Sequence, residues 1–194
     1  MIDPTNSADA ARPDRVLMLC SANQCRSPLT GAFLRQEVER RGLAVEVLTA
    51  GFRESGHPAT PATVEAAAEF GLDLRAHRSR KVDRDLLLGA DAVLGAERLH
   101  VREAVVLERS VWPRAFTLRD VVRRAEAVAP RAPDESLRTW LALLSAGRDR
   151  MTLMGASPED DVLDPTTDRT VDHRTTAELL EGLTRRFVSR AWPA

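Results

Sequence analysis

The sequence contains no tyrosine, a single lysine and only two cysteines among its 194 residues. Cys20 and Cys25 lie five positions apart, so they cannot provide a disulfide framework, and two thiols are too few for a structural zinc site unless histidines contribute. The four histidines are scattered without the spacing of metal ligands: His57, His77, His100 and His173. We therefore expect a protein that needs neither a metal nor another cofactor.

A charge excess and a membrane-spanning segment are absent as well. The 28 basic and 29 acidic residues give a net charge of −1, which argues against nucleic acid or an anionic membrane surface as the main partner. No apolar stretch approaches the length of a transmembrane helix, and residues 1–14 lack the basic and apolar regions of a secretory signal. We expect a cytoplasmic protein in a reducing compartment.

The pattern of apolar residues predicts an α/β fold. Residues 1–14 contain hardly any large apolar side chain and are predicted to form a flexible tail, followed by a single domain over residues 15–194. We expect a four-stranded parallel sheet with helices on both faces. The predicted strands are 16–19, 45–49, 91–95 and 114–118, and the predicted helices are 28–41, 60–71, 82–90, 119–128 and 173–192.

The most informative stretch is residues 15–28, in which a short buried strand ends at Cys20 and a polar loop leads into a helix. Ligands of open α/β sheets bind beyond the carboxyl ends of the strands, which is where Cys20 lies. Ser27 followed by Pro28 predicts a capped helix start, whose free N–H groups attract anions. The planar guanidinium of Arg26 can bind two oxygen atoms at once. The positive electrostatic field of Arg26 and the helix start also favours the thiolate form of Cys20. This loop therefore suits a tetrahedral oxyanion.

Residues 20–28, Cys-Ser-Ala-Asn-Gln-Cys-Arg-Ser-Pro, resemble the phosphate-binding loop of low-molecular-weight protein tyrosine phosphatases, whose signature is Cys, five residues, then Arg-Ser. A second block is similar to that family in order and spacing: Thr49-Ala-Gly, His57-Pro-Ala-Thr-Pro, Gly71-Leu-Asp-Leu and Ala76-His77-Arg-Ser-Arg. The resemblance implies a phosphatase-like domain that hydrolyses phosphomonoesters through a phosphocysteine intermediate.

The resemblance also implies the roles of individual residues. Cys20 is the expected nucleophile, Arg26 the expected phosphate ligand, and Asp164, in an Asp-Pro loop, the expected general acid; otherwise Asp164 is a simple turn residue. Ser27 is expected to bond the Cys20 sulfur. The phosphate is expected to contact the loop residues Ser21, Ala22, Asn23, Gln24, Cys25 and Arg26. Thr49 and His77 are expected to hold Asn23, unless His77 is only an exposed residue of a basic turn.

Two further hypotheses concern the remaining histidines and Cys25. We assign no chemical role to His57, His100 or His173. If Cys20 is oxidised to a sulfenic acid, Cys25 can form a disulfide with it and prevent irreversible oxidation; the alternative is that Cys25 merely packs.

Several positions that bear on the substrate depart from the family pattern. Relatives that accept phosphotyrosine line the pocket with apolar and aromatic residues, whereas this chain has polar side chains there and Phe52 is the only nearby aromatic candidate. The polar positions are Ser21, Gln24, Thr166 and Thr167. Ala22 replaces a glycine, which requires that this position have no positive φ. Ala96-Glu97 stands where relatives have Met-Asp.

We expect as substrate a phosphotyrosine-type phosphorylated protein or a small aryl phosphate ester. Three alternatives remain open: a protein-arginine phosphatase, an arsenate reductase on the same fold, and a non-catalytic oxyanion-binding module. The thioredoxin-coupled kind of arsenate reductase needs further cysteines on a mobile segment, and the sequence has none. The presence of both Cys20 and Asp164 argues against a mere binding module.

An additional helix is predicted within 134–147, before the Asp-Pro loop. Leu137, Trp140, Leu141 and Leu144 follow the spacing of one helical face, and Gly147 marks the end. This face must bury itself against the body of the protein or against a partner. We favour an extra packed helix over a lid or dimer surface, and the sequence leaves the oligomeric state open.

Overall fold

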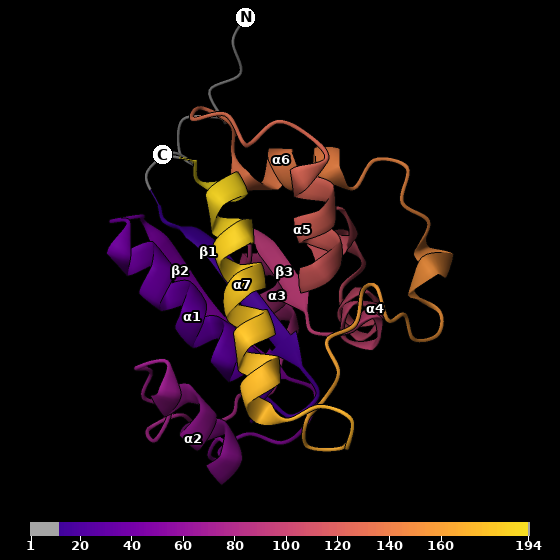
Figure 1. Ribbon diagram of the computed structural model, residues 1–194. Helices are drawn as coiled ribbons and strands as arrows, with labels where there is room; N and C mark the ends of the chain where they lie inside the picture. Colours follow the sequence, from indigo (N-terminus) through magenta and orange to yellow (C-terminus); the bar gives the residue numbers. More distant parts are fainter. Residues whose placement is uncertain (1–11, 194) are drawn as a thin grey trace, which may run out of the picture.

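The computed structural model describes residues 12–193, which form a four-stranded parallel sheet with helices on both faces (Figure 1). The strand order is β2-β1-β3-β4, and the predicted fold class is confirmed. The bounds of the strands are β1 Asp14–Cys20, β2 Val45–Gly51, β3 Ala92–Gly95 and β4 Ala115–Thr117.

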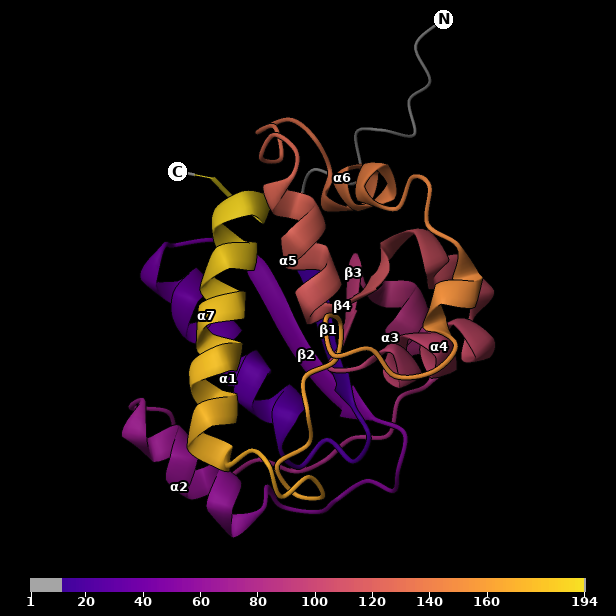
Figure 2. The same cartoon turned by 45° about the vertical axis from the view of Figure 1, so that its right-hand side comes forward.

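The helices lie close to the predicted ranges, with one addition. Helix α4 follows β3 and was not expected, and two short 3-10 helices, η3 Arg109–Arg114 and η4 Arg150–Leu153, occupy predicted loops. The α-helices are α1 Arg26–Arg40, α2 Pro61–Glu69, α3 Arg84–Gly89, α4 Arg98–Leu107, α5 Leu118–Glu126, α6 Leu137–Leu144 and α7 His173–Ala191. Figure 2 shows α7 alongside α1, with α3 and α4 on the other side of the sheet.

Strand β1 is buried on both faces because its side chains alternate between two cores. Val16 and Met18 face the core that is closed by α1, α5, α6 and α7. Leu17 and Leu19 face the core that is closed by α3 and α4. This alternation explains why the strand reads as a continuous apolar run in the sequence. The central strand thus holds Cys20 at its carboxyl end on a rigid support.

The first strand begins earlier than expected, so the predicted tail is too long at its C-terminal end. Asp14 pairs with Val45 in the sheet, and its carboxylate accepts a hydrogen bond from Trp192 Nε1 and pairs with Arg131. These partners come from distant parts of the chain, which is why local composition did not reveal them. The rest of the predicted tail, residues 1–11, lies outside the described residues.

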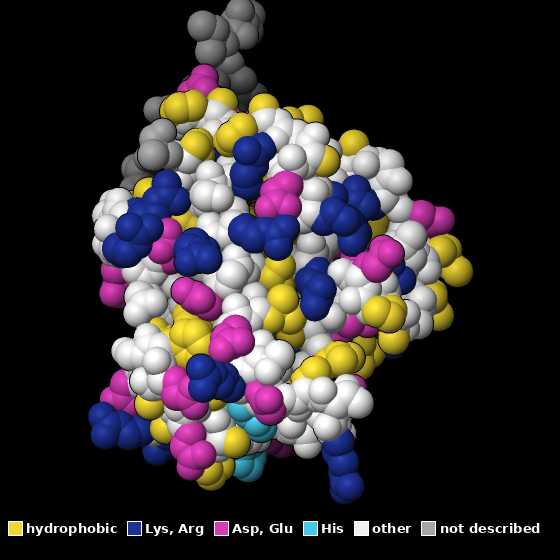
Figure 3. Space-filling view, viewed as in Figure 1, with side chains coloured by type: hydrophobic (Ala, Val, Ile, Leu, Met, Phe, Trp, Pro, Cys, Tyr) yellow, Lys and Arg dark blue, Asp and Glu magenta, His cyan; other side chains and the backbone are white. Residues whose placement is uncertain are grey.

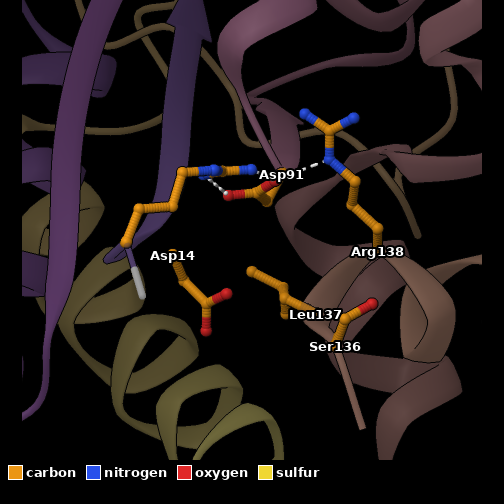
Figure 4. A pocket seen from close by; sticks show the side chains of 6 residues that line it. Asp14, Asp91, Ser136, Leu137 and Arg138 are labelled. Carbon is orange, nitrogen blue, oxygen red and sulfur yellow. Dashed lines mark hydrogen bonds and ion pairs between the residues drawn. The ribbon is translucent and has the colours of Figure 1, made fainter. Parts of the chain in front are cut away.

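The predicted additional helix is α6, and it packs against the body of the protein. Its buried residues are the four that the spacing selected, Leu137, Trp140, Leu141 and Leu144. Ser136 caps its start by accepting a hydrogen bond from the backbone of Thr139. Arg138, on the exposed side, forms an ion pair with the buried Asp91 at the amino end of β3 (Figure 4). Apolar and ionic contacts therefore both tie α6 to the sheet.

The surface carries mixed charge. On the face shown in Figure 3, basic and acidic side chains are interspersed. One ion pair of the surface joins Arg186 of α7 to Glu126 of α5. This agrees with the near balance of charge in the sequence. In residues 12–193, no helix combines the length and the apolar character that crossing a membrane requires.

Candidate active site

Cys20 lies at the carboxyl end of β1, and the loop 21–25 turns directly into α1. The sulfur is almost fully buried and lies 3.0 Å from the hydroxyl oxygen of Ser27. The amide of Asn23 donates to the same hydroxyl oxygen at 2.9 Å. Because Ser27 already accepts this hydrogen bond, its own proton can be donated to the Cys20 sulfur or to the backbone oxygen of Ala50, which lies 3.4 Å away.

The start of α1 differs from the prediction. The helix begins at Arg26, its N-cap residue is Cys25, and the Cys25 side chain makes no capping hydrogen bond. Ser27 therefore is not the cap, because its hydroxyl is engaged with Cys20 and Asn23 instead. The first N–H groups of a helix without such a cap remain available to an anion. The correction strengthens the case for an oxyanion site.

Asn23 shapes the loop. Asn23 is the only residue other than glycine with a positive φ, 54°, among residues 12–193. Ala22 therefore has no positive φ, and alanine can replace the family's glycine there without backbone strain. The Asn23 side-chain oxygen accepts from the backbone N–H of Arg80 at 2.9 Å. Its backbone oxygen lies 2.7 Å from His77 Nε2, which must be the donor. Burial lowers the pKa of His77.

The expectation for Thr49 is wrong in this structure. The hydrogen bonds of the Asn23 side chain go to Ser27 and Arg80, and none goes to Thr49. The Thr49 methyl group instead lies close to Gly31 of α1, where an added Cβ would approach it to 2.4 Å. Thr49 therefore helps to pack α1 on β2. His77, by contrast, does hold Asn23, although through its backbone oxygen.

Arg26 is the largest fully buried side chain near the loop, and two carboxylates flank it. Its Nη1 donates to Glu97 and to the backbone oxygen of Val162, and its Nη2 donates to Asp164 at 2.7 Å. Its Nε is buried and has no hydrogen-bond partner among the described residues. A buried N–H without an acceptor is costly, so this atom is a ready donor for an oxyanion.

Asp164 reaches Arg26 from the Asp-Pro loop. Its second carboxylate oxygen accepts from the backbone and the hydroxyl of Thr166, so Asp164 is both a turn residue and a site residue. Partial burial raises the pKa of Asp164, but the charge of Arg26 and the hydrogen bonds from Thr166 outweigh it, and the pKa lies below its ordinary value. The backbone bond from Val162 N to Ala96 O, 2.8 Å, anchors the loop beside β3.

The loop, Arg26 and Asp164 surround one cavity of about 300 Å³. No aromatic side chain is among its lining residues in the described part of the chain, and most of the side chains away from Cys20 are polar or charged. These are Gln24, Arg53, Thr60, Glu97, Thr166 and Thr167. Phe52, the expected aromatic wall, instead stacks on His100 with the two rings 6.1 Å apart. Within residues 12–193, no group of three or more His, Cys, Asp or Glu side chains is placed to hold a metal ion.

Cys25 is also buried, and it lines the same cavity as Cys20. Burial raises the pKa of Cys25 to about 12, while a contact with Thr63 opposes the rise. Both cysteines are free. Because the thiolate is the reacting form in disulfide exchange, this pKa slows any attack of Cys25 on an oxidised Cys20. Its protective role stays a hypothesis.

The sequence analysis missed three residues of the site. Glu97 and His100 come together at the start of α4, where they form a reciprocal capping box, and His100 also reaches Ser21. The hypothesis that His100 has no chemical role therefore neglects a direct contact with the loop. Gly51 supports the loop from β2, where an added Cβ would lie 2.7 Å from Asn23 N. The spacing Glu-x-x-His after a strand was the available signal for α4.

Residues 15–135 match the family described as low molecular weight phosphotyrosine protein phosphatase. The chain belongs to this family. Among curated members, it is similar to the probable low molecular weight protein-tyrosine-phosphatase EpsP of Ralstonia nicotianae, with 36% identity over 91 residues. That match covers 45% of this chain and 60% of EpsP.

A second relative is the protein-arginine-phosphatase of Bacillus subtilis, which is 33% identical over 108 residues, 55% of this chain and 71% of the relative. Among solved structures of the family, a mutant of YwlE from Bacillus subtilis superposes with a TM-score of 0.68 at 25% identity, covering 91% of this chain and 97% of that one. A structure of a YwlE arginine phosphatase with a phosphorylated active site serine has a TM-score of 0.65, also at 25% identity.

Proposed function

We propose that this protein is a phosphatase that hydrolyses phosphomonoesters through a phosphocysteine intermediate, acting on a phosphorylated protein or a small phosphate ester. The observation that carries the proposal is the meeting of Cys20, Arg26 and Asp164 in one cavity at the uncapped start of α1. Each supplies one requirement of phosphoryl transfer, namely a nucleophile, a ligand for the oxygens and a proton donor. The phosphorylated active site serine in a structure of a YwlE arginine phosphatase supports a covalent step in this reaction.

In the first step, the Cys20 thiolate attacks phosphorus in line with the leaving oxygen. Arg26 and the N–H groups of the loop hold the three equatorial oxygens, while Asp164 gives its proton to the leaving oxygen as its bond to phosphorus breaks. In the second step, Asp164 takes a proton from water, which attacks phosphorus and releases phosphate. The Ser27 hydroxyl, 3.0 Å from the sulfur, stabilises the departing thiolate. This chemistry needs a reduced Cys20, which supports a cytoplasmic location.

Single-turnover hydrolysis of 4-nitrophenyl phosphate without added metal tests the proposal. We expect one rapid phase of 4-nitrophenolate release from the wild type, and no release but retained phosphate binding from Cys20→Ser. Asp164→Asn should slow the first step by roughly 10²- to 10³-fold for phenyl phosphate, and by less for the better 4-nitrophenolate leaving group. Since Asp164 must be protonated, the wild-type rate of this step should fall as pH rises, and the variant should lose that dependence. A fully active Cys20→Ser protein would exclude the mechanism.

A second candidate substrate is phosphoarginine, and the charge of the cavity favours it. Glu97 and Asp164 both face Arg26, and no aromatic ring lines the described cavity to stack on a phenyl group. Carboxylates beside a phosphate site complement a cationic guanidinium leaving group. The arginine phosphatase among the relatives supports this choice.

A comparison of the reaction with two substrates separates these candidates. We propose measuring kcat/KM for matched peptides that carry phosphoarginine or phosphotyrosine, with Glu97→Gln as the diagnostic variant. If the carboxylates recognise the guanidinium, Glu97→Gln should reduce kcat/KM for phosphoarginine more than for phosphotyrosine. An equal effect on both peptides would leave phosphotyrosine as the better assignment.

A further inference from the structure

His100 is fully buried beside the catalytic loop, yet the proposed mechanism does not use it. It occupies the first turn of α4, where its Nδ1 lies 3.0 Å from the backbone nitrogen of Glu97. On the other edge of the ring, Nε2 lies 3.0 Å from the hydroxyl oxygen of Ser21. Phe52 stacks on the ring with an interplanar angle of 9°. Three neighbours thus fix the position and the orientation of this imidazole.

These contacts determine which ring nitrogen carries the proton. The backbone N–H of Glu97 can only donate, so Nδ1 must accept and be unprotonated. Burial lowers the pKa of His100 to about 3, and the positive charge of Arg26 acts in the same direction. The neutral ring therefore carries its proton on Nε2, which donates to the Ser21 hydroxyl oxygen.

Ser21 is consequently left with a hydroxyl proton to donate. Its oxygen accepts from His100, and among residues 12–193 no atom accepts a hydrogen bond from this hydroxyl. The residue itself is held in place, since its backbone oxygen accepts from the N–H groups of Phe52 and Arg53 at 2.8 and 3.2 Å. Ser21 lines the same cavity as Cys20 and Arg26. An acceptor for its proton is expected from the bound group.

We propose that His100 is a positioning residue that fixes the Ser21 hydroxyl as a hydrogen-bond donor to a phosphoryl oxygen in the cavity. This inference rests on the proposed phosphatase function and adds to the backbone N–H groups a side-chain donor of defined direction. A donor that is oriented beforehand needs no rearrangement as negative charge develops on the oxygen, so it stabilises the transition state more than the bound substrate.

A double-mutant cycle tests the coupling between the two residues. His100→Asn keeps a side-chain acceptor at the third helical position for Glu97 N–H, but is too short to donate to Ser21. Ser21→Ala removes the hydroxyl. We expect each variant to lower kcat for 4-nitrophenyl phosphate by about 3- to 10-fold with little change in KM, and to weaken vanadate binding by a similar factor. In the Ser21→Ala background, His100→Asn should have no further effect.

Ser21→Thr provides the rescue, because it keeps a hydroxyl at this position and should remain sensitive to His100→Asn. His57→Asn is the matched histidine control and should behave as wild type, because His57 is exposed and is not among the residues that line the cavity. Additive effects of His100→Asn and Ser21→Ala, or full activity of Ser21→Ala, would overturn the inference. If the wild type lacks turnover while vanadate binding still shows the coupling, the proposed function fails and the positioning role stands.

A spectroscopic measurement keeps the inference testable even if His100→Asn does not fold. The ring nitrogens of His100 in the wild-type protein should give ¹⁵N chemical shifts of a protonated Nε2 and an unprotonated Nδ1. Addition of vanadate should shift the signals of His100 and Ser21 while leaving those of His57 unchanged. A ring protonated on Nδ1 would contradict the proposed donation to Ser21.

Discussion

At the scale of single residues, Gly51 decides how closely the catalytic loop can approach β2. A Cβ at this position would lie 2.7 Å from Asn23 N, 2.8 Å from the carbonyl carbon of Ala22 and 2.9 Å from Ser21 O. All three are backbone atoms of the loop, which cannot turn away as a flexible side chain can. The absence of a side chain at residue 51 is therefore a requirement of the site.

Gly51→Ala should displace the loop and so weaken phosphate binding by about tenfold or more, because a shift of about 1 Å misplaces every donor at once. We also expect a loss of about 1–3 kcal/mol in the free energy of unfolding from overpacking. Calorimetric titration with phosphate and urea unfolding measure the two effects. Gly182→Ala in α7 is the control. Beyond the neighbouring residues and backbone of α7 itself, no described atom lies within 4 Å of an added Cβ, so this variant should be more stable by roughly 0.5–1 kcal/mol and should bind phosphate normally.

The residues of the site differ in how well the sequence predicts them. Cys20, Asn23 and Arg26 belong to one continuous loop, so a local pattern was enough to group them. Glu97 and His100 reach the loop only because β3 lies beside β1 in the sheet, and Gly51 only because β2 does. Strand order is a tertiary property that no local pattern encodes, which is why these contributions were missed.

At the scale of elements, α6 is fastened to the body of the protein at several points. Trp140 is almost fully buried, and Arg148, just beyond the helix, lies over the rings of Trp112 and Phe116. Burial lowers the pKa of Arg148 to about 10, although Asp120 opposes this. Such anchoring is expected of a packed structural element rather than of a lid.

Trp140→Ala should lower the free energy of unfolding by about 3–5 kcal/mol, because it leaves a large cavity under α6. Leu143→Ala, on the exposed side of the same helix, should change it by less than about 0.5 kcal/mol. Urea unfolding of both variants measures the difference. Hydrogen exchange in residues 137–144 should not change when phosphate binds; added protection there would favour a lid.

Element boundaries show what the sequence can predict. The four buried residues of α6 were identified because their spacing is strictly helical. Helix α4 was missed because its N-cap is Glu97, which is a less usual cap than Ser, Thr, Asp or Asn. Strand β2 continues to Gly51 because Ala50 and Gly51 pair with Leu19 and Cys20, again a contact between distant segments.

At the scale of the whole molecule, acid stability depends on buried carboxylates with arginine partners. Burial raises the pKa of Asp91, but Arg12, Arg138 and the backbone N–H of Arg15 outweigh this and hold the pKa below its ordinary value. A carboxylate with a lowered pKa stabilises the folded state fully above its unfolded pKa of about 4, and this contribution is lost as pH falls further. Asp160 is shifted in the same direction, between Arg98 and Arg123.

The free energy of unfolding should therefore decrease as pH falls below about 4. Asp91→Asn should destabilise the protein by about 1–3 kcal/mol at pH 7, because Arg138 loses a charged acceptor. This difference from the wild type should shrink in acid, where Asp91 itself becomes protonated. Chemical unfolding at several pH values measures it. Leu143→Ala, which removes an exposed side chain and no carboxylate, should show no such dependence.

The ion pairs of Arg26 with Glu97 and Asp164 should make the affinity for a bound anion depend on pH. A bound dianion competes with these carboxylates for Arg26 and brings negative charge close to Asp164, which raises the proton affinity of that group. Binding should then take up a fraction of a proton, and sulfate, which does not itself titrate, should bind more tightly as pH falls from roughly 7 to 4. Calorimetry in buffers of different ionisation heats counts the protons, and Asp164→Asn should reduce the count. Before any bond breaks, the bound oxyanion would thus promote protonation of Asp164, the acid that later donates this proton to the leaving group.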